Sequence, residues 1–327
     1  MEINISEKTP TICLNMIVKD ESHIIRHTLE LLCNKIHFSY WVICDTGSTD
    51  NTKQIIVDFF AEKEIDGELH SHVWKDFAHN RTLALNEAFN KTDLLFVFDA
   101  DDEIHGDIKM PRSVDFDGYL LNFGASYVIA YQRILLINNR IHWGYKSVVH
   151  EYIYCLNQTC KTTVLDGDYY VFSGRTGNRS KDPNKYLKDA EILKDAYYEA
   201  KKINDALYLR YGFYCANSYR DFGDSVEAIK WYKVVLQNDN PNQEKYISCL
   251  QIFNIYNKIG EKESGFFYLV ESFRYDIERY ECIQILIQYY SVTGNPFMAY
   301  QYYNIFKDYY ETKYLSVNLI LEHKIFI

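Results

Sequence analysis

The chain has 327 residues, 47% of them hydrophobic, and a formal net charge of −10. This length and composition suit two globular domains with ordinary apolar cores. The negative charge argues against nucleic acid as the main partner, because affinity for a duplex comes from clustered Lys and Arg. The polar N-terminus lacks the features of a signal peptide, and no apolar run approaches the ~20 residues of a membrane span. We therefore expect a soluble, cytoplasmic protein, or a virion-associated one if the source is a virus.

The eight cysteines are scattered along the chain without a Cys-x-x-Cys pair. Several of them lie in apolar stretches, where a free cysteine behaves as a small hydrophobic residue. We expect reduced core residues rather than disulfides or a cysteine-based zinc site.

Short apolar runs alternate with helical patterns along the first half of the chain. Strands are expected at 11–18, 40–45, 69–74 and 93–103, and helices at 21–34, 48–64 and 77–91. This alternation predicts an α/β domain with a mostly parallel sheet and helices on both faces. Ligands of such sheets bind beyond the carboxyl ends of the strands.

The stretch "WVICDTGSTDNT" contains the Asp-Thr-Gly-Ser sequence of aspartic proteases, beginning at Asp45. Those enzymes share a proton between two carboxylates, but the chain has no second Asp-Thr-Gly or Asp-Ser-Gly. The flanks instead predict a strand, a turn and a helix, so Asp45 can accept a hydrogen bond from a bound base or ribose. The alternative is turn chemistry, in which Asp45, Ser48 or Asp50 only holds backbone N–H groups.

The stretch "LLFVFDADDE" brings Asp99, Asp101, Asp102 and Glu103 to the end of one apolar strand. Carboxylates this close repel one another unless a cation lies between them. Oxygen ligands favour Mg²⁺ or Mn²⁺, which can bridge to a diphosphate. We expect a metal site here, with a solvated acidic turn as the alternative.

Three further groups of polar residues are candidates for the same site. Arg81 lies near the start of a helix, from which it can reach a phosphate or a carboxylate, or it can be an ordinary exposed arginine of that helix. His150 and Glu151 can supply a metal ligand and a general base, or can be a structural pair. The stretch 173–188 holds five basic residues, Arg179 and Lys185 among them, against one acid, and it is either an anion-binding loop or an interdomain linker.

After about Asn184 the pattern becomes continuously helical. Gly223, Gly260 and Gly294 fall at intervals of 37 and 34 residues, each four residues after a tyrosine and five before a small residue. This spacing is typical of tetratricopeptide-like repeats, with a glycine in the turn between two helices. A less regular helical bundle is the alternative. We expect an α/β domain at 1–183 and an all-α domain at 184–327.

The stretches "TICLNMIVKDESHIIRHTLE", "WVICDTGSTDNT", "WKDFAHNRTLALNEAF", "DLLFVFDADDE" and "VVHEYI" occur in an order that resembles family 2 glycosyltransferases of the GT-A fold. The chain is most similar to the branch with tetratricopeptide-like helices, found in bacteria and giant viruses. The resemblance implies a nucleotide-sugar donor, typically a UDP-sugar. It places Val18 in the nucleotide pocket, Asp45 at the base and Asp99 near the ribose. Arg81 would hold the nucleotide or the aspartates in place.

The same resemblance implies a metal-dependent transfer with inversion. Asp101 would bind Mn²⁺ or Mg²⁺ at the diphosphate, with His150 completing the metal or phosphate contacts. Glu151 would be the base that activates an acceptor hydroxyl on a glycan or a protein. Arg179 and Lys185 would stabilise the departing diphosphate, and we expect the stretch 173–188 to close over the donor.

Two other functions fit parts of the sequence. A nucleotidyltransferase also uses a metal in an α/β fold, but "NMIVKDE" lacks the Gly-rich phosphate loop. An interaction scaffold would use the helical repeats to bind a protein, or a second copy of the chain, beside an inactive first domain.

Overall fold

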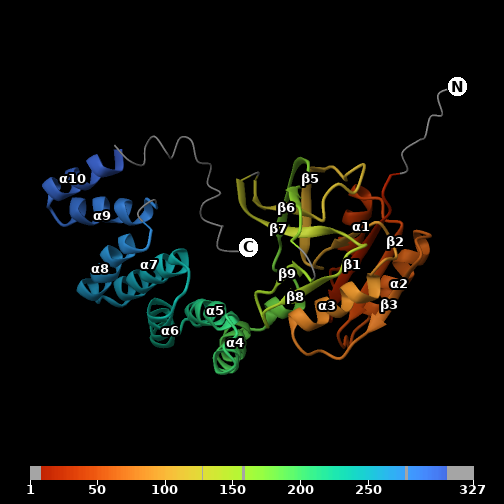
Figure 1. Ribbon diagram of the computed structural model, residues 1–327, viewed down its shortest axis with the longest axis horizontal. Coiled ribbons are helices and arrows are strands. Elements are labelled where there is room, and N and C mark those ends of the chain that lie inside the picture. The colour runs from red at the N-terminus through yellow and green to blue at the C-terminus, as the bar shows by residue number, and fades with distance from the viewer. Residues whose placement is uncertain (1–8, 127, 157–158, 277–278, 308–327) are drawn as a thin grey trace. The chain divides into compact units, whose positions relative to one another are not determined.

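The computed structural model describes residues 9–126, 128–156, 159–276 and 279–307. These residues form two compact units, whose boundary in the sequence lies between Pro183 and Asn184. Each unit has its own hydrophobic core, and Figure 1 labels elements of both units.

Strands and helices alternate along the first part of the first unit. The elements are β1 (Ile12–Val18), α1 (Ile25–Lys35), β2 (Tyr40–Asp45), α2 (Thr52–Glu62), β3 (Gly67–Ser71), α3 (Phe77–Ala88) and β4 (Leu94–Val97). The predicted order of strands and helices is confirmed, although β3 begins earlier than expected and β4 ends before the acidic residues. The acids leave the strand early because β4 is followed by a turn, and Asp102 already belongs to the next strand.

The second part of this unit consists mainly of strands. They are β5 (Asp102–Ile108), β6 (Gly118–Ala125), β7 (Val128–Asn138), β8 (Trp143–Lys146), β9 (Tyr152–Cys155), β10 (Thr162–Val164) and β11 (Gly167–Ser173). The main sheet has the order β3-β2-β1-β4-β7-β6-β11-β5, with β10 paired to β6, and β8 pairs with β9 separately. Strands β3, β2, β1 and β4 are parallel, whereas β7 runs antiparallel to both of its neighbours. The sheet is therefore mixed but mostly parallel, as the sequence predicts.

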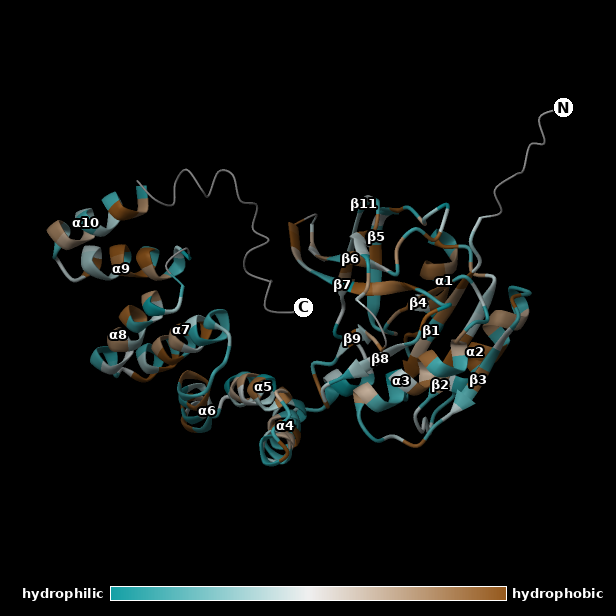
Figure 2. Cartoon of the chain, in the orientation of Figure 1, coloured by the Kyte–Doolittle hydropathy of each residue, from teal (hydrophilic) through white to brown (hydrophobic). Residues whose placement is uncertain are grey.

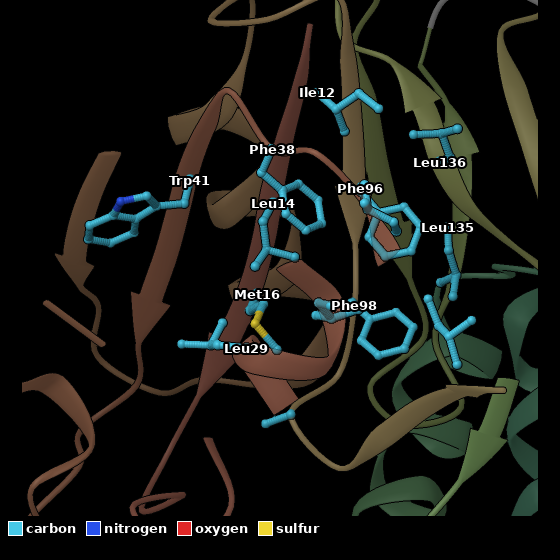
Figure 3. Close-up of a cluster of buried hydrophobic side chains, with 14 of the residues drawn as sticks. Ile12, Leu14, Met16, Leu29, Phe38, Trp41, Phe96, Phe98, Leu135 and Leu136 are labelled. Atoms are coloured by element: carbon cyan, nitrogen blue, oxygen red, sulfur yellow. The ribbon is translucent and has the colours of Figure 1, made fainter. Parts of the chain in front are cut away.

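Alternation along the parallel strands builds a core on each face of the sheet, because successive side chains point to opposite faces. Leu14, Met16 and Phe96 lie in one cluster with residues of α1 and α2 (Figure 3). Cys13 and Leu95, which directly precede Leu14 and Phe96, lie in the other cluster, with the alanines of α3. Both faces are thus covered by helices.

The second unit contains pairs of helices. Its described elements are α4 (Lys185–Lys202), α5 (Leu207–Phe222), α6 (Ser225–Gln237), α7 (Asn242–Ile259), α8 (Lys262–Glu271), η2 (Ser272–Arg274), α9 (Glu281–Val292) and α10 (Pro296–Phe306). Hydrophobic and hydrophilic residues are mixed along each of these helices, as amphipathic packing requires (Figure 2).

Three helical hairpins turn in the same way. Gly223, Gly260 and Gly294 have φ angles of 97°, 89° and 78°, and each lies between two helices. This left-handed conformation favours glycine, because a Cβ atom strains it. In each turn the residue after the glycine donates its backbone N–H to the carbonyl of the tyrosine four residues before that glycine. All three of these hydrogen bonds, to Tyr219, Tyr256 and Tyr290, measure 2.9 Å. The predicted glycine turns are confirmed.

No described helix is both long and apolar enough to cross a lipid bilayer. All eight cysteines are free thiols, and five of them are buried.

Candidate active site

The carboxyl ends of β1, β2 and β4 meet at one edge of the sheet. Val18 and Asp45 are register partners in the parallel pair of β1 and β2, and β4 flanks β1 on its other side. Both residues are buried, at 3% and 1% exposure. Asp99 follows β4 by two residues, so the three chain segments present polar groups at the same edge.

Asp45 holds the turn that follows β2. Its carboxylate accepts backbone N–H groups from Gly47 at 3.0 Å and from Ser48 at 3.1 Å. Gly47 has a φ angle of 104°, which a side chain would strain. The carbonyl of Val18 accepts the N–H of Thr46 at 2.9 Å, which ties the turn to β1. Turn chemistry is therefore observed at Asp45, and a carboxylate still has lone pairs for a ligand.

Asp50 and Ser48 both hold backbone N–H groups, but in different segments. Asp50 accepts the N–H of Thr52, the first residue of α2, at 3.0 Å. Although burial opposes it, hydrogen bonds from Thr52 and Ser22 hold the pKa of Asp50 well below its usual range. The Ser48 hydroxyl instead accepts the N–H of Asp20 at 2.9 Å. Ser48 joins the ends of β1 and β2 rather than starting the helix.

Arg81 connects two carboxylates from distant parts of the chain. Its Nε donates to Oε1 of Glu151 at 2.7 Å, and its Nη2 donates to Oδ1 of Asp99 at 2.6 Å. Arg133 on β7 lies 3.8 Å from the other oxygen of Asp99. Two guanidinium groups thus face two carboxylates, and the predicted exposed-helix alternative for Arg81 is wrong because its side chain is only 8% exposed.

The charges in this cluster stabilise one another. Burial acts against the ionised forms, but Asp99 and Glu151 hold the pKa of Arg81 above its usual value. Burial likewise acts on Asp99, yet Arg81 and Arg133 hold the pKa of that carboxyl below its usual range. A buried charge in such a network requires its partners, so the four side chains form one electrostatic unit.

The four acids after β4 do not form a single cluster of unpaired charges. Asp99 is neutralised by arginines, and Glu103 lies 3.4 Å from Nε2 of His105. Asp102 begins β5 and is 3% exposed, and burial raises its pKa to about 7, with Asp99 adding to the effect. Protein groups therefore relieve part of the expected repulsion among these acids.

Asp101 contacts the segment that follows β11. Its backbone carbonyl accepts the N–H of Gly174 at 3.0 Å, and its Oδ2 accepts the N–H of Gly177 at 3.2 Å. Glu21 accepts the next N–H, that of Asn178, at 3.2 Å. Burial raises the pKa of Glu21 to about 7. The residues 174–178 thus dock on two carboxylates at the carboxyl edge of the sheet.

The other predicted site residues lie in less enclosed surroundings. His150 is exposed and has a φ angle of 54°. Arg179 lies in the 3-10 helix η1 (Asn178–Lys181), with its guanidinium 4.7 Å from the ring centre of Phe77. Lys185 is the first residue of α4, in the second unit. The stretch 173–188 is therefore not one loop, because its last four residues are helical.

Sequence reasoning missed Arg133. An arginine inside the apolar strand "VIAYQRILLIN" is the signal that could have revealed it, because a buried cation requires an acid nearby. Burial also raises the pKa of Tyr145 to about 12, and its ring lies 5.7 Å from the guanidinium of Arg81. Neither contact follows from spacing. The contact of Arg133 depends on the pairing of β7 with β4, and that of Tyr145 depends on the packing of α3 against β8.

Comparison with known proteins gives one family and several solved structures. Residues 13–143 match the model of the family described as Glycosyl transferase family 2. Residues 1–349 of TarS from S. aureus, in complex with UDP-GlcNAc, align at 14% identity with a TM-score of 0.43, covering 81% of this chain and 91% of that one. Glucosyl-3-phosphoglycerate synthase from Mycobacterium tuberculosis, in complex with Mn²⁺, UDP and glucosyl-3-phosphoglycerate, aligns at 16% identity with a TM-score of 0.24, covering 28% of this chain and 34% of that one.

No curated protein matches the chain. With TM-scores below 0.5, the two structural similarities identify no function for this chain. The family match runs from β1 through β7 to the first residue of β8, and it includes Asp45, Arg81, Asp99 and Asp101. The first unit therefore contains a glycosyl transferase family 2 domain, and the chain is an enzyme of the glycosyltransferase class.

Proposed function

We propose that the first unit transfers a sugar from a nucleoside diphosphate donor, a UDP-sugar, to a hydroxyl of a glycan or protein acceptor, with inversion. The observation that carries this proposal is the buried link from Arg81 to both Asp99 and Glu151, at the sheet edge within and beside the family-matched segment. A nucleotidyltransferase is not supported by that match.

The donor nucleoside would bind between the ends of β1 and β2. Val18 is buried there beside Asp45, whose oxygens keep lone pairs after accepting the N–H groups of the turn. Such an acceptor suits the imide N–H of uracil. Asp99, held by Arg81 and Arg133, would accept a hydrogen bond from a ribose hydroxyl.

A divalent metal fits beside the donor diphosphate. Asp101 offers a carboxylate at this edge, and its hydrogen bond to Gly177 is long enough, at 3.2 Å, to be exchanged for an ion. Oxygen ligands of this kind suit Mn²⁺ and Mg²⁺, and His150 would add a ligand or a phosphate contact. When bound, the ion would neutralise charge on the leaving diphosphate.

Glu151 would remove the proton from the acceptor hydroxyl as that oxygen attacks the anomeric carbon. Its side chain is 10% exposed and its Oε1 is fixed by Arg81, which leaves Oε2 as the atom for the acceptor. A base held by a buried ion pair is pre-oriented, which reduces the entropic cost of reaching the transition state. Arg81 is a positioning residue in this scheme, because it acts through Asp99 and Glu151.

The residues 174–179 would close over the donor. They dock on Asp101 and Glu21 through backbone N–H groups, and the carbonyl of Thr176 lies 3.0 Å from Nε2 of His23. Arg179 follows directly and would bind the diphosphate.

The helical unit would be a tetratricopeptide-like stack that presents the acceptor or a protein partner. Its support is the repetition of one turn geometry in three hairpins.

The test is turnover of donor. The protein is incubated with Mn²⁺ and a panel of nucleotide sugars, with the released nucleoside diphosphate measured. We expect release with a UDP-sugar and its loss in Asp101→Ala. Arg140→Lys, an exposed arginine on the same unit, is the matched control and should keep the wild-type rate. If no donor is consumed by the folded protein, the scaffold function replaces this proposal.

A further inference from the structure

A cluster of metal-ligating side chains lies outside the candidate active site. In the part of the chain that the structure describes, one group of three or more His, Cys, Asp or Glu side chains has ligand atoms close enough to share an ion, namely His70, His72 and Glu87. These atoms all lie within 4.8 Å of one another. Asp101 and His150 do not belong to this group, so it is independent of the donor metal.

The fold produces this cluster from a strand and a helix. His70 lies in β3, and His72 follows it at the i+2 position, so both point to the same face. Their rings are stacked, with centres 6.2 Å apart and planes at 7°. Glu87 approaches them from the last turn of α3, which covers this face of the sheet.

The distances from each imidazole to the nearer oxygen of Glu87 are close to the spacing of ligands around a tetrahedral ion. Nδ1 of His70 lies 3.6 Å from Oε2 of Glu87, and Nε2 of His72 lies 3.4 Å from Oε1 of the same residue. Ligands bound to zinc at about 2.0 to 2.2 Å in a tetrahedron are about 3.4 Å apart. The side chains are 19–35% exposed, so water can reach a fourth position.

The surroundings of both imidazoles also suit a metal. Nε2 of His70 lies 2.8 Å from Oε2 of Glu68, which fixes the ring and leaves Nδ1 to face Glu87. A carboxylate behind a ligating histidine is the common outer partner of zinc sites. Nε2 of His72 is enclosed by protein and makes no hydrogen bond to any described residue, although Glu87 is near. An ion would satisfy this nitrogen.

We propose that His70, His72 and Glu87 bind one Zn²⁺ ion, with water as the fourth ligand and Glu68 as the outer partner of His70. Two imidazoles and one carboxylate favour zinc over the Mg²⁺ or Mn²⁺ expected at an all-oxygen site. The ion joins β3 to α3. The backbone N–H of His72 donates to the carbonyl of Asp45 over 2.9 Å, so the zinc also anchors the edge that carries Asp45.

The experiment uses the full chain without an affinity tag, stripped of metal by a chelator. Zn²⁺ is titrated by calorimetry in excess Mg²⁺, and Co²⁺ is used as a visible probe of coordination. We expect one equivalent of Zn²⁺ with a dissociation constant of about 1 µM or below, and a tetrahedral Co²⁺ spectrum without a thiolate band. Hydrogen exchange of the amides in β3 and at the end of α3 should slow when Zn²⁺ binds.

Matched variants separate this site from others. His72→Ala and His70→Ala should abolish binding, and Glu68→Gln, which keeps all three ligands, should weaken it by about 10- to 100-fold. His37→Ala, an exposed histidine elsewhere, should bind as the wild type does. The double variant Cys155→Ser, Cys160→Ser and the variant Asp101→Ala should also keep the site, which excludes thiols and the donor metal.

Absence of binding at about 10 µM Zn²⁺ would overturn the proposal. Unchanged affinity in His72→Ala, or loss of binding in the cysteine variant, would do the same. None of these outcomes depends on glycosyl transfer.

Discussion

The Nε atom of Arg81 lies 2.7 Å from Oε1 of Glu151, seventy residues further along the chain. The same guanidinium donates through Nη2 to Asp99, so one side chain fixes an acid from the end of β4 and an acid that precedes β9. Only arginine can donate in two directions with a fixed angle between the bonds, since a lysine ammonium is a point charge on a flexible stem.

Arg81→Lys should therefore separate positioning from charge. The variant keeps a cation near Asp99 but loses the simultaneous contact with Glu151, and a misplaced group costs about 10²-fold in rate. We expect kcat to fall by about that factor while UDP affinity changes little. Arg81→Ala leaves two buried carboxylates with one cation, and we expect it to lose about 3–5 kcal/mol of stability. Steady-state kinetics and urea unfolding measure the two effects, and an unchanged kcat in Arg81→Lys would contradict the positioning role.

Asp101→Asn should impair transfer without unfolding the protein. The side chain accepts one long backbone hydrogen bond, so the amide should cost no more than about 1 kcal/mol of stability. Loss of the proposed metal ligand removes several kcal/mol of transition-state stabilisation, which corresponds to at least about 10²-fold in kcat. Thermal unfolding and donor turnover at increasing Mn²⁺ check both parts. A variant that turns over donor normally at low Mn²⁺ would exclude Asp101 as the ligand.

Local pattern was enough to predict the elements near the site but not the pairing of charges within it. Alternation of apolar residues located β1, β2 and β4, and the glycine spacing located the turns at Gly223, Gly260 and Gly294. The sequence also indicated that Arg81 can reach a phosphate or a carboxylate, because its helix leads into the strand that the acids follow. It could not show that Arg133 neutralises Asp99, since that contact depends on the antiparallel pairing of β7 with β4.

The metal expectation illustrates the same limit. Four neighbouring acids predicted one metal site, but the structure gives them different surroundings. Asp99 pairs with arginines and Asp102 is buried at the start of β5, which leaves Asp101 as the proposed ligand. The cluster of His70, His72 and Glu87 went unnoticed because its third member comes from a helix fifteen residues later. Only the packing of α3 on β3 joins them.

Arg179→Ala should weaken donor binding if residues 174–179 close over the diphosphate. Arg179 is exposed and contacts the ring of Phe77, so its removal should leave stability almost unchanged. One charged hydrogen bond is worth about 1.5–3 kcal/mol, so UDP affinity should fall by about 10- to 100-fold. Lys181→Ala, in the same short helix, is the matched control. Equal UDP affinity in Arg179→Ala and the wild type, measured by calorimetry, would reject this closure.

Stability in acid should depend on Asp93. Its carboxylate accepts the N–H of Thr11 at 2.9 Å and faces Arg140 at 3.0 Å, contacts that lower its pKa from 3.8 to about 2. A lowered folded-state pKa gives stability that is present above pH 3.8 and is lost as the pH falls toward 2. Asp93→Asn should be less stable at pH 7, and the difference from wild type should shrink as the pH falls through that window. Urea unfolding from pH 2 to 7 measures it, and a constant difference would contradict the assignment.

The helical unit should be sensitive to added side chains at two glycines of one hairpin, for different reasons. At Gly260 the space is open but φ is 89°, so Gly260→Ala should cost about 1 kcal/mol through backbone strain alone. At Gly265 an added Cβ atom would lie 3.2 Å from Cβ of Tyr256 and 3.3 Å from the carbonyl of Phe253, where α7 and α8 cross. Gly265→Val should therefore cost more, about 1–3 kcal/mol through overpacking. Helical circular dichroism during thermal unfolding compares the two, and a larger loss in Gly260→Ala than in Gly265→Val would show that the crossing is not close-packed.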